Sequence, residues 1–304
     1  MKIISRNYNL DEDLELIMQF LRSVYQETKS LQNWFPDRFE NSCDDHISDI
    51  RIWEEIDETR SPPQHKLVAF ANPEDPFCYF IQIHPDYSFL EREIIQWIES
   101  HSVAKKIDFK QEQKLNIITV DGNSSREKIL TELGFKKRTD RIYGHLRFRP
   151  LDMPIEEYSL PDGFIIRSVE GKPDHEQLAR AVRTVFGHGE WFNAELSERI
   201  RQRSFHKPDL DLVAVAPNGT IASFCTFRVD PESRITQLEP MGTLPEFRKL
   251  GLAKALLSEG FKRLEKYNPT LIYIGGAATN PAALRLYDSS FPEKIDMHIW
   301  TKEI

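Results

Sequence analysis

The residues whose chemistry is clearest lie between positions 248 and 254. Arg248, Lys249 and Lys254 are basic, and the apolar pattern that begins after Gly251 predicts a helix. Backbone N–H groups at a helix start have no partner within the helix and carry partial positive charge. Glycine lets a ligand approach the backbone, and the basic side chains add full charges. The segment therefore predicts a site for a phosphate-bearing ligand.

This loop differs from two well-known phosphate loops. The Walker spacing Gly-x4-Gly-Lys-Ser/Thr is missing, and a single glycine does not make a dinucleotide fingerprint. Many strand-to-helix turns with a glycine and basic residues bind nothing, so the prediction requires a second motif.

A second motif, the segment from Asn280 to Phe291, follows further along the chain. Together the two segments resemble the GNAT family of acyl-CoA-dependent N-acyltransferases. In that family an Arg/Gln-x-x-Gly-x-Gly/Ala loop holds the coenzyme A pyrophosphate. A later Asn-x-x-Ala-x-x-Leu-Tyr-x-x-x-Gly-Phe helix flanks the pantetheine arm. Ser290 stands where the family has glycine, and the resemblance covers roughly residues 162–304. The matching residues are Arg248, Gly251 and Ala253 in the loop, and Asn280, Ala283, Leu286 and Tyr287 in the helix.

The resemblance implies acetyl-CoA as the co-substrate, held by three segments. In the GNAT fold two neighbouring strands part, and backbone groups in the gap pair with the pantetheine arm. Pro240 indicates an edge or a bulge at this place, because proline cannot donate to a ladder. The implied binding residues are Met241, Gly242, Thr243, Arg248, Lys249, Leu250, Gly251, Leu252, Ala253, Lys254, Asn280 and Ala283.

Acyl transfer to an amine requires a base, a donor for the carbonyl oxygen and help for the departing thiolate. Strand alternation puts Glu239, Met241 and Thr243 on one face, so Glu239 is the candidate base; the alternative is a solvated carboxylate. A backbone N–H near Met241 is the candidate donor to the oxygen. The family assigns the acid role to the tyrosine matched by Tyr287, which could instead be a core residue.

The acceptor is less clearly marked. His188, Trp191 and Phe192 lie in the segment that covers the acceptor pocket in GNAT folds, where they indicate an apolar acceptor or only packing. We expect the primary amine of a small molecule, attacking acetyl-CoA directly in a ternary complex. Two alternatives stay open: a non-enzymatic acyl-CoA-binding regulatory or interaction module, and an acetyltransferase acting on a peptide or protein amine. The pattern specifies no oligomeric state.

The chain also repeats itself at a nearly constant offset. Pro85 and Pro245 lie 160 positions apart, and Asn123 and Asn280 lie 157 apart. Such a repeat predicts two copies of one fold. The first copy lacks the loop glycine and has Glu91 near the expected anion position, where a carboxylate would repel pyrophosphate. We therefore expect this copy to be degenerate, with a structural or substrate-shaping role.

Together, resemblance and repeat imply two tandem GNAT-type domains of the α/β (α+β) class, each a mixed, mostly antiparallel sheet flanked by helices. The first, degenerate domain spans residues 1–147, a proline-containing linker covers 148–162, and the catalytic domain spans 163–304. Within the latter, apolar runs predict strands at 164–169, 212–216, 220–227, 235–243 and 271–276, and a strand at 291–300 that completes its sheet.

Composition narrows the classes of function and the cellular location that we expect for the protein. A net charge of −8 argues against a nucleic-acid or anionic membrane surface. Three scattered cysteines without CxxC spacing are typical of reduced thiols, so we expect a cytoplasmic protein. The first residues do not form a signal peptide, and no apolar run is long enough for a membrane span. The nine histidines are dispersed, so we expect no metal site.

Overall fold

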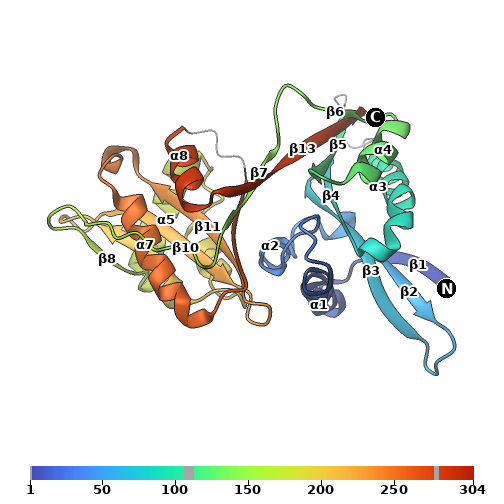
Figure 1. Cartoon of the computed structure of the whole chain (residues 1–304), viewed down its shortest axis with the longest axis horizontal. Helices are drawn as coiled ribbons and strands as arrows, with labels where there is room; N and C mark the ends of the chain where they lie inside the picture. Colours follow the sequence, from blue (N-terminus) through green and yellow to red (C-terminus); the bar gives the residue numbers. More distant parts are fainter. Residues whose placement is uncertain (1, 106–112, 277–280) are drawn as a thin grey trace. The chain divides into compact units, whose positions relative to one another are not determined.

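Two units make up the chain, as Figure 1 shows for a computed structural model. Unit 1 consists of Met1–Leu146 and Ile295–Ile304, and unit 2 of Arg147–Lys294. The structure describes residues 2–105, 113–276 and 281–304. Each unit is a mixed, mostly antiparallel sheet with helices packed on it, which confirms the expected fold class.

In unit 1 the sheet has the strand order β1-β2-β3-β4-β5-β13. All these neighbours are antiparallel except β4 and β5, which run parallel. The elements that start in unit 1 are β1 (Lys2–Asn7), α1 (Leu10–Thr28), α2 (Pro36–Ser42), β2 (Arg51–Asp57), β3 (Gln64–Asp75), β4 (Cys78–Ile83), α3 (Glu91–Lys105), β5 (Lys114–Val120), α4 (Ser124–Glu132), β6 (Lys136–Lys137) and β7 (Gly144–Arg149).

In unit 2 the sheet has the order β8-β9-β10-β11-β12, and here too a single pair, β11 and β12, is parallel. In each unit, therefore, the fourth and fifth strands in the chain form the parallel pair. The elements that start in unit 2 are β8 (Ile165–Ser168), α5 (Gly171–Phe186), α6 (Ala194–Ile200), β9 (Asp211–Val215), β10 (Ile221–Val229), β11 (Ile235–Thr243), α7 (Leu252–Leu264), β12 (Leu271–Gly276), α8 (Pro281–Ser290) and β13 (Glu293–Glu303).

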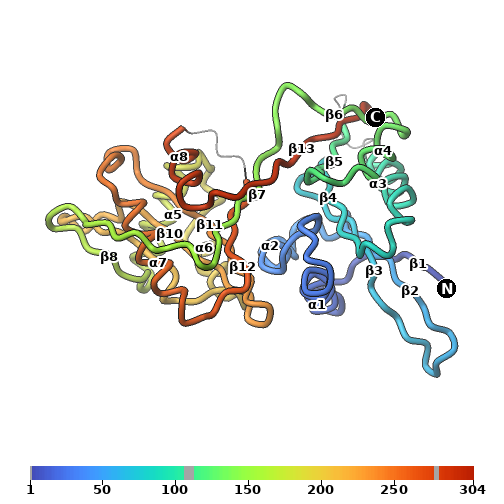
Figure 2. The backbone as a smooth tube through the Cα atoms, in the orientation of Figure 1, coloured from blue at the N-terminus to red at the C-terminus, as the bar shows by residue number. Residues whose placement is uncertain are grey.

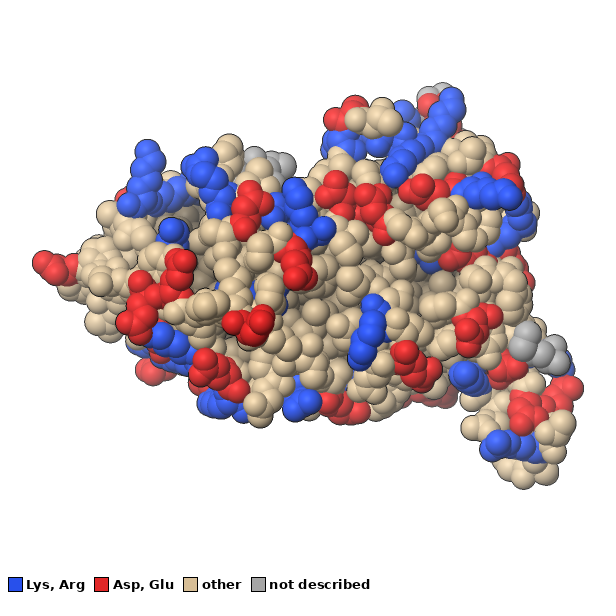
Figure 3. All heavy atoms as spheres, in the orientation of Figure 1, with Lys and Arg blue, Asp and Glu red and all other residues tan. Residues whose placement is uncertain are grey.

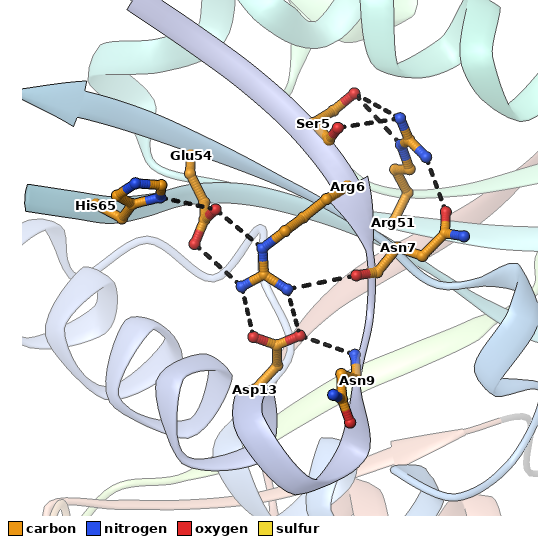
Figure 4. A network of polar contacts seen from close by, with 8 residues as sticks. All are labelled: Ser5, Arg6, Asn7, Asn9, Asp13, Arg51, Glu54 and His65. Carbon is orange, nitrogen blue, oxygen red and sulfur yellow. Dashed lines mark hydrogen bonds and ion pairs between the residues drawn. The ribbon is translucent and has the colours of Figure 1, made fainter. Parts of the chain in front are cut away.

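The first strand of each unit is joined to its first helix by the same ion pair. In unit 1, Arg6 donates to both carboxylate oxygens of Asp13 on α1, and Glu54 accepts from the other side of the guanidinium (Figure 4). In unit 2, Arg167 on β8 pairs in the same way with Asp174 on α5. Both aspartates also accept from a backbone N–H four residues earlier, at 2.8 and 2.7 Å. This shared contact supports the duplication.

In unit 2, individual residues end a helix, cap a helix and form a turn at the positions that their types indicate. Helix α5 ends at Gly187, whose φ of 72° is a left-handed conformation that suits glycine. The side chain of Asn193 accepts from the N–H of Leu196 and so caps α6. Strands β9 and β10 form an antiparallel pair around Asn218 and Gly219, as this dipeptide predicts.

The last strand forms where expected, but most of its residues belong to unit 1. Residues Ile295–Ile304 of β13 belong to unit 1, where Met297 pairs with Val120 and Trp300 with Ile117 on β5 (Figure 2). The prediction that this strand completes the second sheet is therefore wrong, and the domain ending at 304 differs from unit 2. Alternating apolar residues indicate a strand, but they do not say which sheet edge receives it.

Charges on the face drawn in Figure 3 are interspersed, with basic and acidic side chains next to one another. Across the described residues, no helix combines the length and apolar character that crossing a bilayer requires.

Candidate functional site

The start of α7 leaves backbone amides exposed. Gly251 has a φ of 79°, and in the described part of the chain no side chain caps the helix at this residue. Ala255 donates its N–H to the oxygen of Gly251 at 3.1 Å, which is the first bond of the helix. The amides of residues 252–254 therefore have no acceptor within α7 and are available to an anion.

Cationic side chains surround these amides. Arg248, Lys249 and Lys254 are all exposed, as is Leu250 between them. The Nε atom of Arg248 donates to the backbone oxygen of Thr243 at 3.3 Å, which ties the loop to the end of β11. Residues 248–254 thus combine three exposed basic side chains with uncapped amides.

Strand β11 extends beyond its ladder with β12. In the described chain this ladder runs from Ile235 to Gln237, although β11 continues to Thr243. The N–H of Leu244 donates to the oxygen of Ala222, a residue of β10, at 2.9 Å. Because backbone groups alternate along a strand, those of Met241 and Thr243 point away from β10. A ligand beside β11 could pair with them.

A β-bulge changes which side chains of β11 point into the core. Leu238 pairs with Phe227 and Met241 with Cys225, so Glu239 and Pro240 together oppose one residue of β10. This confirms the expected irregularity at Pro240. However, Leu238 and Met241 both enter the core beneath α7. The prediction that Glu239 and Met241 share a face by simple alternation is therefore wrong, because the extra residue shifts the alternation.

Packing fixes Gly242, which lies between Met241 and Thr243. A Cβ at Gly242 would lie 2.5 Å from Phe224 and 2.8 Å from Val185. The hydroxyl of Ser223 lies 2.8 Å from both the oxygen of Gly242 and Oγ1 of Thr243. Sequence reasoning missed Ser223, whose position opposite Thr243 in the β10–β11 hairpin was the available signal.

Tyr287 lies on α8 and packs against the core beneath α7. Burial raises the pKa of its phenol, and the negative charge of Glu239 raises it further. The structure therefore brings the two candidate catalytic residues within electrostatic reach, and the phenol is protonated at neutral pH. Ala283 is half-buried on the same helix, whereas Asn280 lies outside the described residues.

The aromatic residues of the segment after α5 form one cluster. The ring centroids of His188 and Trp191 are 4.9 Å apart, and those of Trp191 and Phe192 are 5.8 Å apart. Trp191 is 62% exposed. An exposed indole of this kind is available to an apolar part of a ligand.

Unit 1 has corresponding elements, but its own side chains occupy the places that match the start of α7 and the edge of β11. At the start of α3, Oε1 of Glu91 accepts from Arg126 of α4 at 2.9 Å, and both side chains are at most 2% exposed. Arg126 also donates to the oxygen of Ile81 on β4. The side chain of Asn33 accepts from the N–H of Ile83 at 2.9 Å and donates to its oxygen at 3.0 Å. Side chains thus occupy the backbone edge that β11 presents in unit 2.

Comparisons with known proteins agree with this geometry. Residues 176–291 match the model of the acetyltransferase (GNAT) family. Unit 2 carries a GNAT acetyltransferase-family domain. Over 174 residues the chain is 30% identical to the mycothiol acetyltransferase of Salinispora arenicola, a match that covers 54% of this chain and 55% of that protein. The chain thus spans about half the length of the curated relatives it matches.

The fold of the whole chain has solved counterparts. A GCN5-related N-acetyltransferase from Sphaerobacter thermophilus superposes with a TM-score of 0.66 at 16% identity, covering 99% of this chain and 95% of that one. A tandem GNAT protein from the clavulanic acid biosynthesis pathway gives a TM-score of 0.66 at 12% identity, covering 99% and 98%. Both units of the chain are covered in these superpositions, so the chain shares the overall fold of the two structures.

Proposed function

We propose that the chain is an N-acetyltransferase that uses acetyl-CoA as co-substrate and the primary amine of a small molecule as acceptor. The observation that carries this proposal is the start of α7, where uncapped amides and three exposed basic residues lie together. They would bind the pyrophosphate of coenzyme A. The pantetheine arm would lie along β11 and pair with Met241 and Thr243, beside Ala283 and, by resemblance, Asn280.

The chemistry would proceed by direct attack within a ternary complex. Glu239 would accept a proton from the ammonium of the acceptor, and the neutral amine would then attack the carbonyl carbon, while the N–H of Met241 would stabilise the negative charge on the carbonyl oxygen. As the carbon–nitrogen bond forms, the carbon–sulfur bond breaks, and the proton that the new amide nitrogen loses ends on the departing thiolate. Because the pKa of Tyr287 is raised, its phenol would act mainly as a hydrogen-bond donor to the sulfur.

Unit 1 would bind no coenzyme A. Its internal contacts at Glu91, Arg126 and Asn33 support this part of the proposal. Isothermal titration calorimetry with coenzyme A would then give one site per chain, and a second site would contradict a filled unit 1.

The decisive experiment measures release of free coenzyme A thiol from acetyl-CoA with a panel of small primary amines and lysine-containing peptides. We expect turnover with at least one small amine and none with Gly251→Glu. A chain that binds coenzyme A but never turns over would favour a binding module instead. Turnover with peptides alone would move the acceptor to proteins.

A further inference from the structure

Two aspartates and a histidine of unit 1 converge where β5 ends. Asp121 directly follows β5, whereas Asp296 and His298 are alternate residues of β13 and share one of its faces. One ligand atom from each of the three lies within 4.8 Å of the other two, and all three side chains are half-buried. Residues distant in sequence thus form one group.

The sheet holds these side chains in place. His298 pairs with Thr119 in the β5–β13 ladder, and the N–H of Asp121 donates to the oxygen of Asp296 at 2.9 Å. On the other side of β13, the N–H of Tyr143 donates to Met297 at 2.8 Å. Strands position ligating groups more rigidly than loops do.

A fourth group extends the cluster. Nδ1 of His145, on β7, lies 2.7 Å from Oδ1 of Asp296, and Nε2 of His298 lies 2.8 Å from Oδ1 of Asp121. An imidazole bonded to a ligating carboxylate is a common outer partner at metal sites, and His145 has this position beside Asp296. Lys137 lies 3.6 Å from Asp121, but it also pairs with Glu127 at 2.9 Å and can keep that contact alone.

We propose that Asp121, Asp296 and His298 bind one divalent first-row transition-metal ion such as Zn²⁺. Two carboxylate oxygens and an imidazole nitrogen suit these ions, with bonds of about 2.1 Å that put tetrahedral ligand atoms roughly 3.4 Å apart. The observed spread requires an inward movement on the order of 1 Å. The bound ion would hold β13 to β5 in unit 1, whereas the acyl-transfer site proposed above lies in unit 2.

The test uses the tag-free full chain after treatment with a chelator. Titration with ZnCl₂ by calorimetry should give one ion per chain, and Co²⁺ should develop ligand-field absorption in the visible range. Asp296→Asn and His298→Gln should each lower the affinity for Zn²⁺ by at least about 10- to 100-fold. His65→Gln is the matched control, because it removes an imidazole that contacts Glu54 elsewhere in unit 1, and it should bind as the wild type does.

Two results would overturn the site. In the first, the wild-type chain binds neither ion, which requires no variant to fold. In the second, both ions bind but Asp296→Asn and His298→Gln retain the wild-type affinity. Either result would leave the two Asp–His contacts as ion pairs that only join strands.

Discussion

The helix starts of α7 and α3 correspond in the two units, yet one is open and the other is filled. Counted from Pro245 and Pro85, Gly251 corresponds to Glu91. A Cβ at Gly251 would meet no atom of the described residues within 4 Å. The carboxylate of Glu91, in contrast, is buried against Arg126. Unit 1 therefore supplies its own anion where unit 2 leaves room for one.

Further residues along the proposed cofactor path also differ between the two units, and in unit 1 side chains of the protein fill the space. Counted from Asn123 and Asn280, Arg126 corresponds to Ala283, so a long cation replaces a small residue. Asn33 bonds both backbone groups of Ile83, the counterpart of Thr243. The sequence suggested that Glu91 would repel a pyrophosphate. The structure gives a different reason, because the protein's own side chains make the contacts.

The largest effect is expected when the internal ion pair of unit 1 is broken. Arg126→Ala should lower the free energy of unfolding by about 3–5 kcal/mol, because Glu91 would stay buried without its partner. Urea denaturation followed by tryptophan fluorescence measures this loss. Arg92→Ala is the control, since its pair with Glu132 is exposed and should be worth at most about 1 kcal/mol. Equal losses in the two variants would contradict a structural role for the buried pair.

Copying the residue of unit 1 into unit 2 should remove cofactor binding. Gly251→Glu should weaken coenzyme A binding about 100-fold or more, because a carboxylate would face the pyrophosphate. Calorimetry measures the affinity. Gly251→Asn tests backbone strain alone, since asparagine tolerates positive φ. Ser88→Glu puts the same charge into the corresponding segment of unit 1 and should leave binding unchanged; a loss there would place the cofactor in unit 1.

Opening the strand edge of unit 1 should cost stability without creating a site. Asn33→Leu removes two hydrogen bonds to Ile83, so the free energy of unfolding should fall by about 1–3 kcal/mol. Coenzyme A should still bind at one site per chain, because Glu91 and Arg126 remain in place. A second site in this variant would show that Asn33 alone closes unit 1.

The smallest effect concerns the phenol, whose counterpart in unit 1 is Leu130. Tyr287→Phe should lower kcat about tenfold while the Kd for coenzyme A stays constant, as expected for one lost hydrogen bond to the leaving sulfur. Because the pKa of Tyr287 is raised, its phenol stays protonated to about pH 10, and wild type and variant should share the alkaline limb of the rate profile. Tyr267→Phe, which loses only a contact to Asp209, is the control. Unchanged kcat would remove the proposed role.

Local patterns predicted the elements of unit 2 well. The strand at 235–243 has the bounds expected, and the bulge occurs at the predicted proline. These two features depend on backbone chemistry within a few residues, namely the alternation of apolar residues and the missing N–H of Pro240. The faces of Glu239 and Met241 were predicted wrongly, because a bulge shifts the alternation by one position.

Long-range contacts were mostly missed. The repeated Arg-x6-Asp pairing of Arg6 with Asp13 and Arg167 with Asp174 was present in the sequence and could have strengthened the duplication. The pairing of Glu91 with Arg126 had no such signal, because the two residues lie on different helices. The same holds for Asp121 and His298, which are close only because β13 joins the sheet of unit 1.

The sequence by itself determined where the basic segment before α7 and the segment of α8 lie, and that the chain contains two copies of one fold, since each is a pattern within a short segment or a fixed offset. Only the tertiary structure decided which sheet receives the last strand, and that the corresponding place in unit 1 is filled by its own side chains. The physical reason is that strand pairing and buried ion pairs depend on surfaces brought together by the whole fold, and no local spacing specifies them.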